Sequence, residues 1–114
     1  MELYDRILML CASTMDSLSV PKKAIRVHNR AMQELHRLKK ALYREEGHGV
    51  AVIAPLLEQS DARVLIYAAS YCLEADVLVE RAREVLTSIR QESPDSLHRL
   101  NAYFTLMLTP REDW

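Results

Sequence analysis

Glycine occurs only twice in this chain of 114 residues, and both copies stand in the segment Gly47-His48-Gly49. The four prolines are spread along the chain, at positions 21, 55, 94 and 110. Alanine, leucine, methionine, lysine, arginine, glutamate and glutamine, which favour the helix, make up more than half of the sequence. A many-stranded sandwich or barrel needs many turn residues, so this composition excludes one. It also excludes the glycine-rich loops GxxxxGK and GxGxxG, which hold phosphate.

The length and the apolar content of 49% predict a single helical domain over residues 1–114 with its own core. The net charge is −1, so the whole chain shows no bias toward nucleic acid or membranes. We expect a cytoplasmic protein, because no signal peptide and no apolar run long enough to cross a bilayer are found. A disulfide between Cys11 and Cys72 stays open, but a cytoplasmic chain favours two buried thiols.

Hydrophobic spacing divides the chain into six helical segments, of which the first two cover its N-terminal half. The first runs from about residue 3 to 18, within a capping region 1–19, and has an apolar stripe (Leu3, Ile7, Leu10 and Met15, with Cys11 and Leu18 alongside). The second, about 21–45 within a basic region 21–46, starts at a proline, the usual first-turn signal. Its seam has the 4-3-4 spacing of a helix packed at a shallow angle on a neighbour (Ala31, Leu35, Leu38 and Leu42). The glycine segment ends it, because glycine readily adopts the left-handed cap.

Four shorter segments follow. The third covers 50–59 with Pro55 inside it, and the fourth covers 62–73 after a Ser60-Asp61 cap. The fifth covers 75–91, with Leu78, Ala82, Val85 and Ile89 as its buried seam. The sixth begins after Ser93-Pro94-Asp95 and runs to Thr109-Pro110 through apolar positions (Leu97, Leu100, Tyr103, Phe104 and Met107). Short links predict antiparallel neighbours, and two hairpins, 50–73 and 75–108, have nearly the length of a two-helix solenoid repeat.

The segment 54–69, APLLEQSDARVLIYAA, resembles a HEAT-type repeat, with a leucine-rich first helix, a polar turn containing aspartate, and a second helix carrying valine and an alanine pair. With NRAMQEL at 29–35, the glycine corner and ERAREVL at 80–86, the chain is similar over about 22–108 to a small uncharacterised bacterial family of HEAT-like (armadillo-type) single domains. The resemblance implies an all-α, right-handed stack of about five to six antiparallel helices, with two HEAT-like hairpins in 50–109, and no established activity. Leu65 stands where such repeats usually carry arginine, so a polar ladder through that arginine is not expected.

No constellation of residues predicts catalysis, a metal or a cofactor. The motif HExxH is absent, and Asp95 and His98 form a single i, i+3 pair where a di-metal bundle needs two such pairs and further carboxylates. A surface or capping pair is therefore the favoured interpretation of these two residues. Cysteines on apolar stripes are unreactive, and no serine stands in a nucleophile elbow. The carboxylates Glu80 and Glu84 are typical of a solvated helix face. We therefore expect no enzyme.

Charge is segregated along the chain. Residues 21–46 contain eight basic and three acidic residues, whereas the rest contains seven basic and thirteen acidic ones. Helical spacing places most of the basic residues on a stripe turned away from the leucine seam, which is either a solvated face or a docking surface for an anionic partner. We take the following as candidate partner-binding residues: Lys23, Arg26, Arg30, Arg37, Lys40 and Arg44.

These patterns favour a non-catalytic helical scaffold that binds a protein with an acidic surface. A sharper hypothesis is an immunity or antidote-type protein that neutralises a bacterial toxin. The alternative is an accessory protein that binds nucleic acid through the basic stripe, which the lack of aromatic residues on that stripe disfavours. A membrane is disfavoured because the apolar faces belong to the core. A small enzyme or ligand carrier ranks lowest, and the choice between a monomer and a homodimer stays open.

Overall fold

The structure is a computed structural model that describes residues 2–12 and 22–107, with only the course of the helix given for 22–25. Within these ranges every regular element is helical, which confirms the all-α prediction. The elements are α1 (Glu2–Ala12), α2 (Lys22–Arg44), a short 3₁₀ helix η1 (Glu46–Gly49), α3 (Val50–Leu56), α4 (Ala62–Ala75), α5 (Val79–Glu92) and α6 (Ser96–Met107). The expected continuation of the first helix through Met15 and Leu18, and the tail with Trp114, lie outside the described residues.

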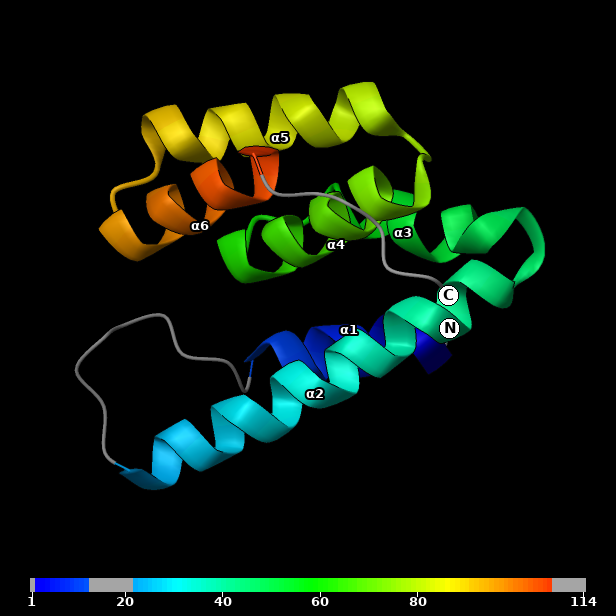
Figure 1. Cartoon of the computed structure of the whole chain (residues 1–114), viewed down its shortest axis with the longest axis horizontal. Coiled ribbons are helices and arrows are strands. Elements are labelled where there is room, and N and C mark those ends of the chain that lie inside the picture. The colour runs from blue at the N-terminus through cyan, green and yellow to red at the C-terminus, as the bar shows by residue number, and fades with distance from the viewer. Residues whose placement is uncertain (1, 13–21, 108–114) are drawn as a thin grey trace.

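The helices form two groups joined at one end (Figure 1). Helices α4, α5 and α6 pack together, whereas α1 packs along α2. The corner made by η1 and α3 leads from α2 to α4. Helix α4 is central, because it contacts α1, α3, α5 and α6.

One continuous apolar core connects the two groups. Its largest side chains that are almost completely buried come from both groups and from the corner (Ile7, Leu35, Leu42, Ile53, Leu56, Tyr71 and Leu86). The four seam residues of the long helix from Ala31 to Leu42 are all buried. The small pair Ala68 and Ala69 of α4 is also fully buried.

The glycine corner has the predicted left-handed backbone. Gly47, His48 and Gly49 have φ values of 64°, 54° and 74°. A β-carbon added to Gly49 would lie 2.9 Å from the side chain of Leu42 and 3.1 Å from its carbonyl oxygen, whereas one added to Gly47 would meet nothing within 4 Å. Glycine is therefore favoured at position 49 by both the backbone angle and the close packing of α2, and at position 47 by the backbone angle alone.

The predicted boundary between the fourth and fifth helices is wrong. Helix α4 continues to Ala75, and two residues with positive φ, Asp76 (58°) and Leu78 (48°), separate it from α5. Aspartate tolerates this conformation better than most residues and here ends α4 with its N–H bonded to the carbonyl of Cys72. Leu78 precedes α5 and is 39% exposed, so it is not part of the buried seam.

Two other helices differ from prediction. Helix α3 ends at Leu56, because the chain after Pro55 closes in hydrogen-bonded turns in place of a further helical turn. In α6 the buried position is Ala102, and three residues expected along its apolar path are about half exposed or more (Leu100, Phe104 and Met107). Among the described elements, α6 makes substantial contacts only with α5 and α4. Much of its apolar surface is therefore not covered by described residues.

Candidate functional site

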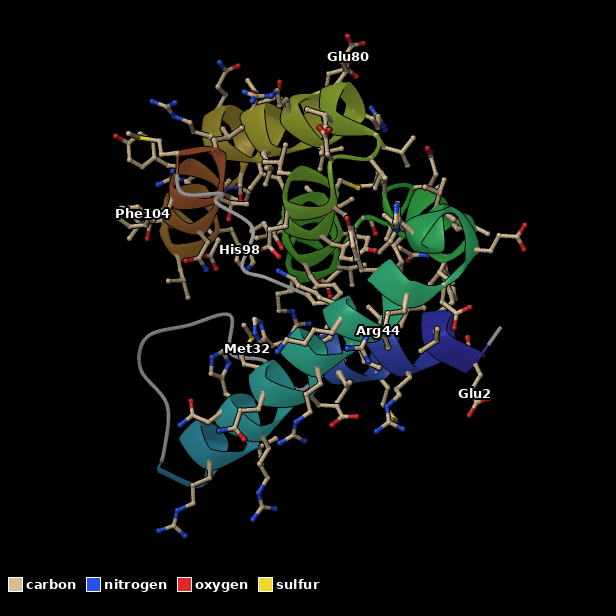
Figure 2. All side chains as sticks on the ribbon, turned by 45° about the vertical axis from the view of Figure 1, so that its right-hand side comes forward. Glu2, Met32, Arg44, Glu80, His98 and Phe104 are labelled. Atoms are coloured by element: carbon tan, nitrogen blue, oxygen red, sulfur yellow. The ribbon has the colours of Figure 1, made fainter. Side chains whose placement is uncertain are left out.

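Helix α2 carries a basic face, which we define as Arg26, Arg30, Arg37, Lys40 and Arg44. All five side chains are exposed, and Figure 2 shows Arg44 near the C-terminal end of the helix. From Arg26 to Arg44 the face extends over about 27 Å at the rise of an α-helix. The remaining candidate, Lys23, lies in α2, but its side chain is outside the described residues. The face is turned away from the buried seam, as the helical spacing predicts.

Acidic neighbours neutralise only part of the basic face. Glu34 forms an ion pair with Arg37 at 3.4 Å and another with Arg6 of α1. The Arg37 side chain remains 72% exposed, so this pair is screened by solvent and weak. No ion pair joins Arg26, Arg30, Lys40 or Arg44 to another residue in the part of the chain that the structure describes. Most of the positive charge of the face is therefore available to a partner.

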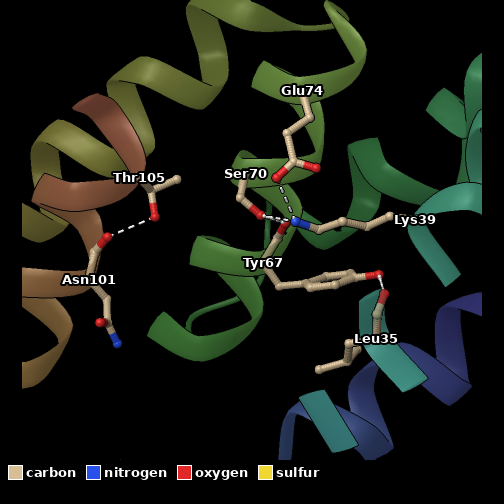
Figure 3. A network of polar contacts seen from close by, with 7 residues as sticks. All are labelled: Leu35, Lys39, Tyr67, Ser70, Glu74, Asn101 and Thr105. Carbon is tan, nitrogen blue, oxygen red and sulfur yellow. Dashed lines mark hydrogen bonds and ion pairs between the residues drawn. The ribbon is translucent and has the colours of Figure 1, made fainter. Parts of the chain in front are cut away.

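Lys39 lies on the other side of α2 and is buried (Figure 3). Its ammonium group donates to the Ser70 hydroxyl at 2.8 Å and pairs with the Glu74 carboxylate at 3.0 Å. It also lies 5.4 Å from the centre of the Tyr67 ring. The Tyr67 hydroxyl donates to the carbonyl of Leu35 at 2.6 Å, and burial raises the pKa of that hydroxyl. Long polar side chains thus connect α2 to α4.

Sequence reasoning missed this network, since it counted Lys39 only as one of the eight basic residues of 21–46 and gave it no role. A weak signal was present: Lys39 follows the buried Leu35 by four residues and therefore lies beside the seam. Ser70 and Glu74 have the same spacing on the next long helix, so they share one face of α4. Nothing local, however, indicates that these two faces meet.

Arg63 joins the start of α4 to the end of α1. Its guanidinium donates to the Asp61 carboxylate at 3.0 Å and to the main-chain carbonyl of Ala12 at 3.3 Å. The hydrogen bond from Arg63 holds the pKa of Asp61 below its ordinary value. Asp61 also accepts from the Arg63 backbone N–H, which confirms the predicted helix cap. The cation thereby connects α4 to the main chain of α1.

Both cysteines are buried, as predicted, and neither forms a disulfide. Burial raises the pKa of Cys11 to about 12 and that of Cys72 to about 12. A thiol with such a pKa holds almost no thiolate at neutral pH, so neither sulfur is an activated nucleophile.

A cleft of about 470 Å³ opens between α2, α4 and α6, with Cys11 of α1 also on its wall. Its volume is in the range of small-molecule sites. The lining side chains include five that contain basic nitrogen and no carboxylate. These five are His28, His36, Lys39, Arg63 and His98. Sequence patterns do not predict this cleft, since its lining residues come from four separate helices.

His98 stands at the first turn of α6, where Asp95 caps the helix. The Asp95 carboxylate accepts from the N–H groups of Leu97 at 2.8 Å and His98 at 3.3 Å, so this pair is a cap, as the sequence indicated. The Nε2 atom of His98 is buried and has no hydrogen-bond partner among the described residues. No group of three or more potential metal ligands comes together within 2–12 and 22–107.

None of the described helices combines the length and the apolar character needed to cross a membrane. No protein-family model, curated protein or solved structure matches this chain. The resemblance to HEAT-like domains consequently stays a prediction.

Proposed function

We propose that this protein is a non-catalytic helical scaffold that binds an acidic partner protein through the basic face of α2. The observation that carries the proposal is the exposure of five cations along one side of a helix whose opposite side is buried. A surface of this kind raises the rate of association with an anionic partner and fixes its orientation. The right-handed HEAT-like stack is part of the same proposal, supported by the packing of α5 on both α4 and α6.

A protein partner is favoured over nucleic acid because the basic face contains no aromatic side chain for base stacking. Tyr43, the aromatic residue of α2, instead stacks on His48 with ring centres 4.2 Å apart. Glu34 also interrupts the run of cations, which suits a partner with mixed charge better than a uniform phosphate backbone. The immunity or antidote form of the proposal names one class of such partners, a toxin with an acidic surface.

The test is a charge reversal of the basic face. The triple variant Arg26→Glu, Arg30→Glu and Arg37→Glu should lose a stoichiometric partner that co-purifies with the tagged wild-type chain from its native host. Because the three side chains are exposed, the variant should keep the wild-type circular dichroism spectrum and cooperative melting. Binding of the purified partner, measured by calorimetry, should weaken at least about tenfold and depend on salt.

The matched control reverses three exposed arginines of α5, Arg81, Arg83 and Arg90, which changes the net charge by the same amount. Retention of the partner by this control and loss by the α2 variant would support the proposal. Equal retention by both variants would refute it. Tight, salt-sensitive binding of duplex DNA or RNA by the wild type, abolished by the α2 variant alone, would favour the nucleic-acid alternative.

A further inference from the structure

We propose that the cleft between α2, α4 and α6 binds a small carboxylate with an apolar body, such as a medium-chain fatty acid. The inference is independent of the basic face, because none of the five residues that define the face lines the cleft. It depends on three features of the cleft: the orientation of its ion pairs, its apolar rim, and a buried ring nitrogen without a partner.

Two ion pairs present their positive ends to the cleft. Lys39 and Arg63 line it, whereas their carboxylate partners Glu74 and Asp61 do not. In each pair the positive charge is therefore nearer the cleft than the negative charge. Lys39 has three N–H donors, and Ser70 and Glu74 account for two of them. An anionic group in the cleft would be attracted by both pairs, and a cationic group would be repelled.

Apolar side chains line the same cleft from both sides. Met32 of α2 and Phe104 of α6 are 45% and 47% exposed, and both belong to the lining. Leu35 and Ile66 extend this apolar surface. Burial of exposed hydrocarbon against these residues supplies affinity that a bare inorganic anion would not gain. The pattern of an apolar wall with a few polar groups is typical of small-molecule sites.

The Nε2 atom of His98 identifies a polar contact for the ligand. A buried polar atom without a partner is costly, so most such atoms are hydrogen-bonded in native proteins. The imidazole of His98 can present an N–H at this position, depending on its tautomer, and would then donate to a carboxylate oxygen. Because Nε2 has almost no accessible surface, the imidazole has to turn toward the cleft for this contact to form. The ligand would then satisfy a group that no described residue satisfies.

The experiment is a calorimetric titration of the purified full chain with decanoate below its micelle concentration. We expect saturable binding by decanoate and none by decylammonium, which has the same chain and the opposite charge. His98→Leu should weaken decanoate binding about tenfold, since hydrogen bonds to charged groups are worth about that factor. Phe104→Gln should weaken it through loss of the apolar wall, without disturbing a buried residue.

Leu100→Gln is the matched control, because Leu100 is an exposed apolar residue of α6 that does not line the cleft. It should bind decanoate as the wild type does.

Three results of the titration would refute the proposal. The first is the absence of saturable decanoate binding, and the second is equal binding of decanoate and decylammonium. The third is an equal effect of His98→Leu, Phe104→Gln and the control Leu100→Gln on decanoate affinity. A dimer in light scattering that Phe104→Gln converts to a monomer would also refute it, because a second copy would then occupy the cleft. Loss of partner binding in the α2 charge-reversal variant with unchanged decanoate affinity would separate this site from the proposed protein-binding face.

Discussion

At the scale of single residues, the adjacent lysines 39 and 40 have opposite roles. The Lys40 side chain is exposed on the basic face, whereas Lys39 is buried between Tyr67, Ser70 and Glu74. The side chains of Lys39 and Glu74 are 11% and 21% exposed. At this depth the ion pair is weakly screened, and removal of one member leaves a partly buried charge without its counterion.

This difference predicts unequal stability changes. Lys39→Met should lower the free energy of unfolding by about 2 kcal/mol, because Glu74 loses its counterion and Ser70 loses a donor. Lys40→Met, the matched control, should change it by less than about 0.5 kcal/mol. Urea denaturation at neutral pH measures both. Equal changes in the two variants would show that the network does not contribute to stability. Adding Glu74→Leu to Lys39→Met should recover part of the loss, since no unpaired charge remains.

At the scale of elements, the corner η1 controls how α2 leads into α3. Three successive residues with positive φ reverse the chain within a few positions. The hydroxyl of Tyr71 donates to the carbonyl of His48 at 2.6 Å, which ties the corner to α4. The His48 ring contacts the carbonyl of Tyr43 through Nδ1 at 2.7 Å and stacks on the Tyr43 ring. A left-handed backbone is unfavourable for His48, because this residue has a β-carbon. The three contacts stabilise the turn and offset that cost.

The two glycines should respond differently to alanine. Gly47→Ala should lower the free energy of unfolding by about 1 kcal/mol, the cost of a left-handed residue with a β-carbon, since the added atom meets nothing. Gly49→Ala should cost at least about 2 kcal/mol, because its β-carbon also meets the backbone oxygen of Leu42. Thermal and urea unfolding of both variants provide the measurement. The interpretation of the corner would be wrong if Gly47→Ala were the more damaging substitution.

At the scale of the whole molecule, α4 joins the pair formed by α1 and α2 to the group formed with α5 and α6. Part of this junction is apolar packing around the fully buried Tyr71. The polar part consists of side chains of α4 that donate to the main chain of other elements. Figure 3 shows one of these bonds, from the Tyr67 hydroxyl to the carbonyl of Leu35. The cleft lies at the same junction, so its shape depends on these contacts.

The two tyrosine hydroxyls should therefore stabilise the whole domain. Tyr67→Phe and Tyr71→Phe should each lower the free energy of unfolding by about 1 kcal/mol, because each removes a hydrogen bond from α4 to the main chain of another element. Tyr103→Phe is the control, since the contact of that ring with Arg90 at 4.7 Å does not need the hydroxyl. It should be close to neutral. If Tyr103→Phe cost as much as the other two, the hydroxyl bonds would not explain the junction.

The sequence alone determined the features that depend on near neighbours. The seam from Ala31 to Leu42, the left-handed corner and the Asp95 cap follow from helical periodicity and backbone sterics, which act within a few residues. The exposed basic face follows from the same periodicity, because a face opposite a buried seam must point to solvent. The break after α4 was misplaced, since Asp76 and Leu78 adopt a glycine-like backbone without being glycine.

Tertiary structure alone decided which polar groups meet. Lys39 bonds residues 31 and 35 positions away, and Arg63 reaches a carbonyl 51 positions away. The charge pattern of each helix is compatible with many partners, and only the packing of α4 against its neighbours selects among them. The cleft and the unpartnered nitrogen of His98 arise in the same way. Local sterics therefore fixed the helices and their solvent faces, and the packing of distant segments created the network and the cleft.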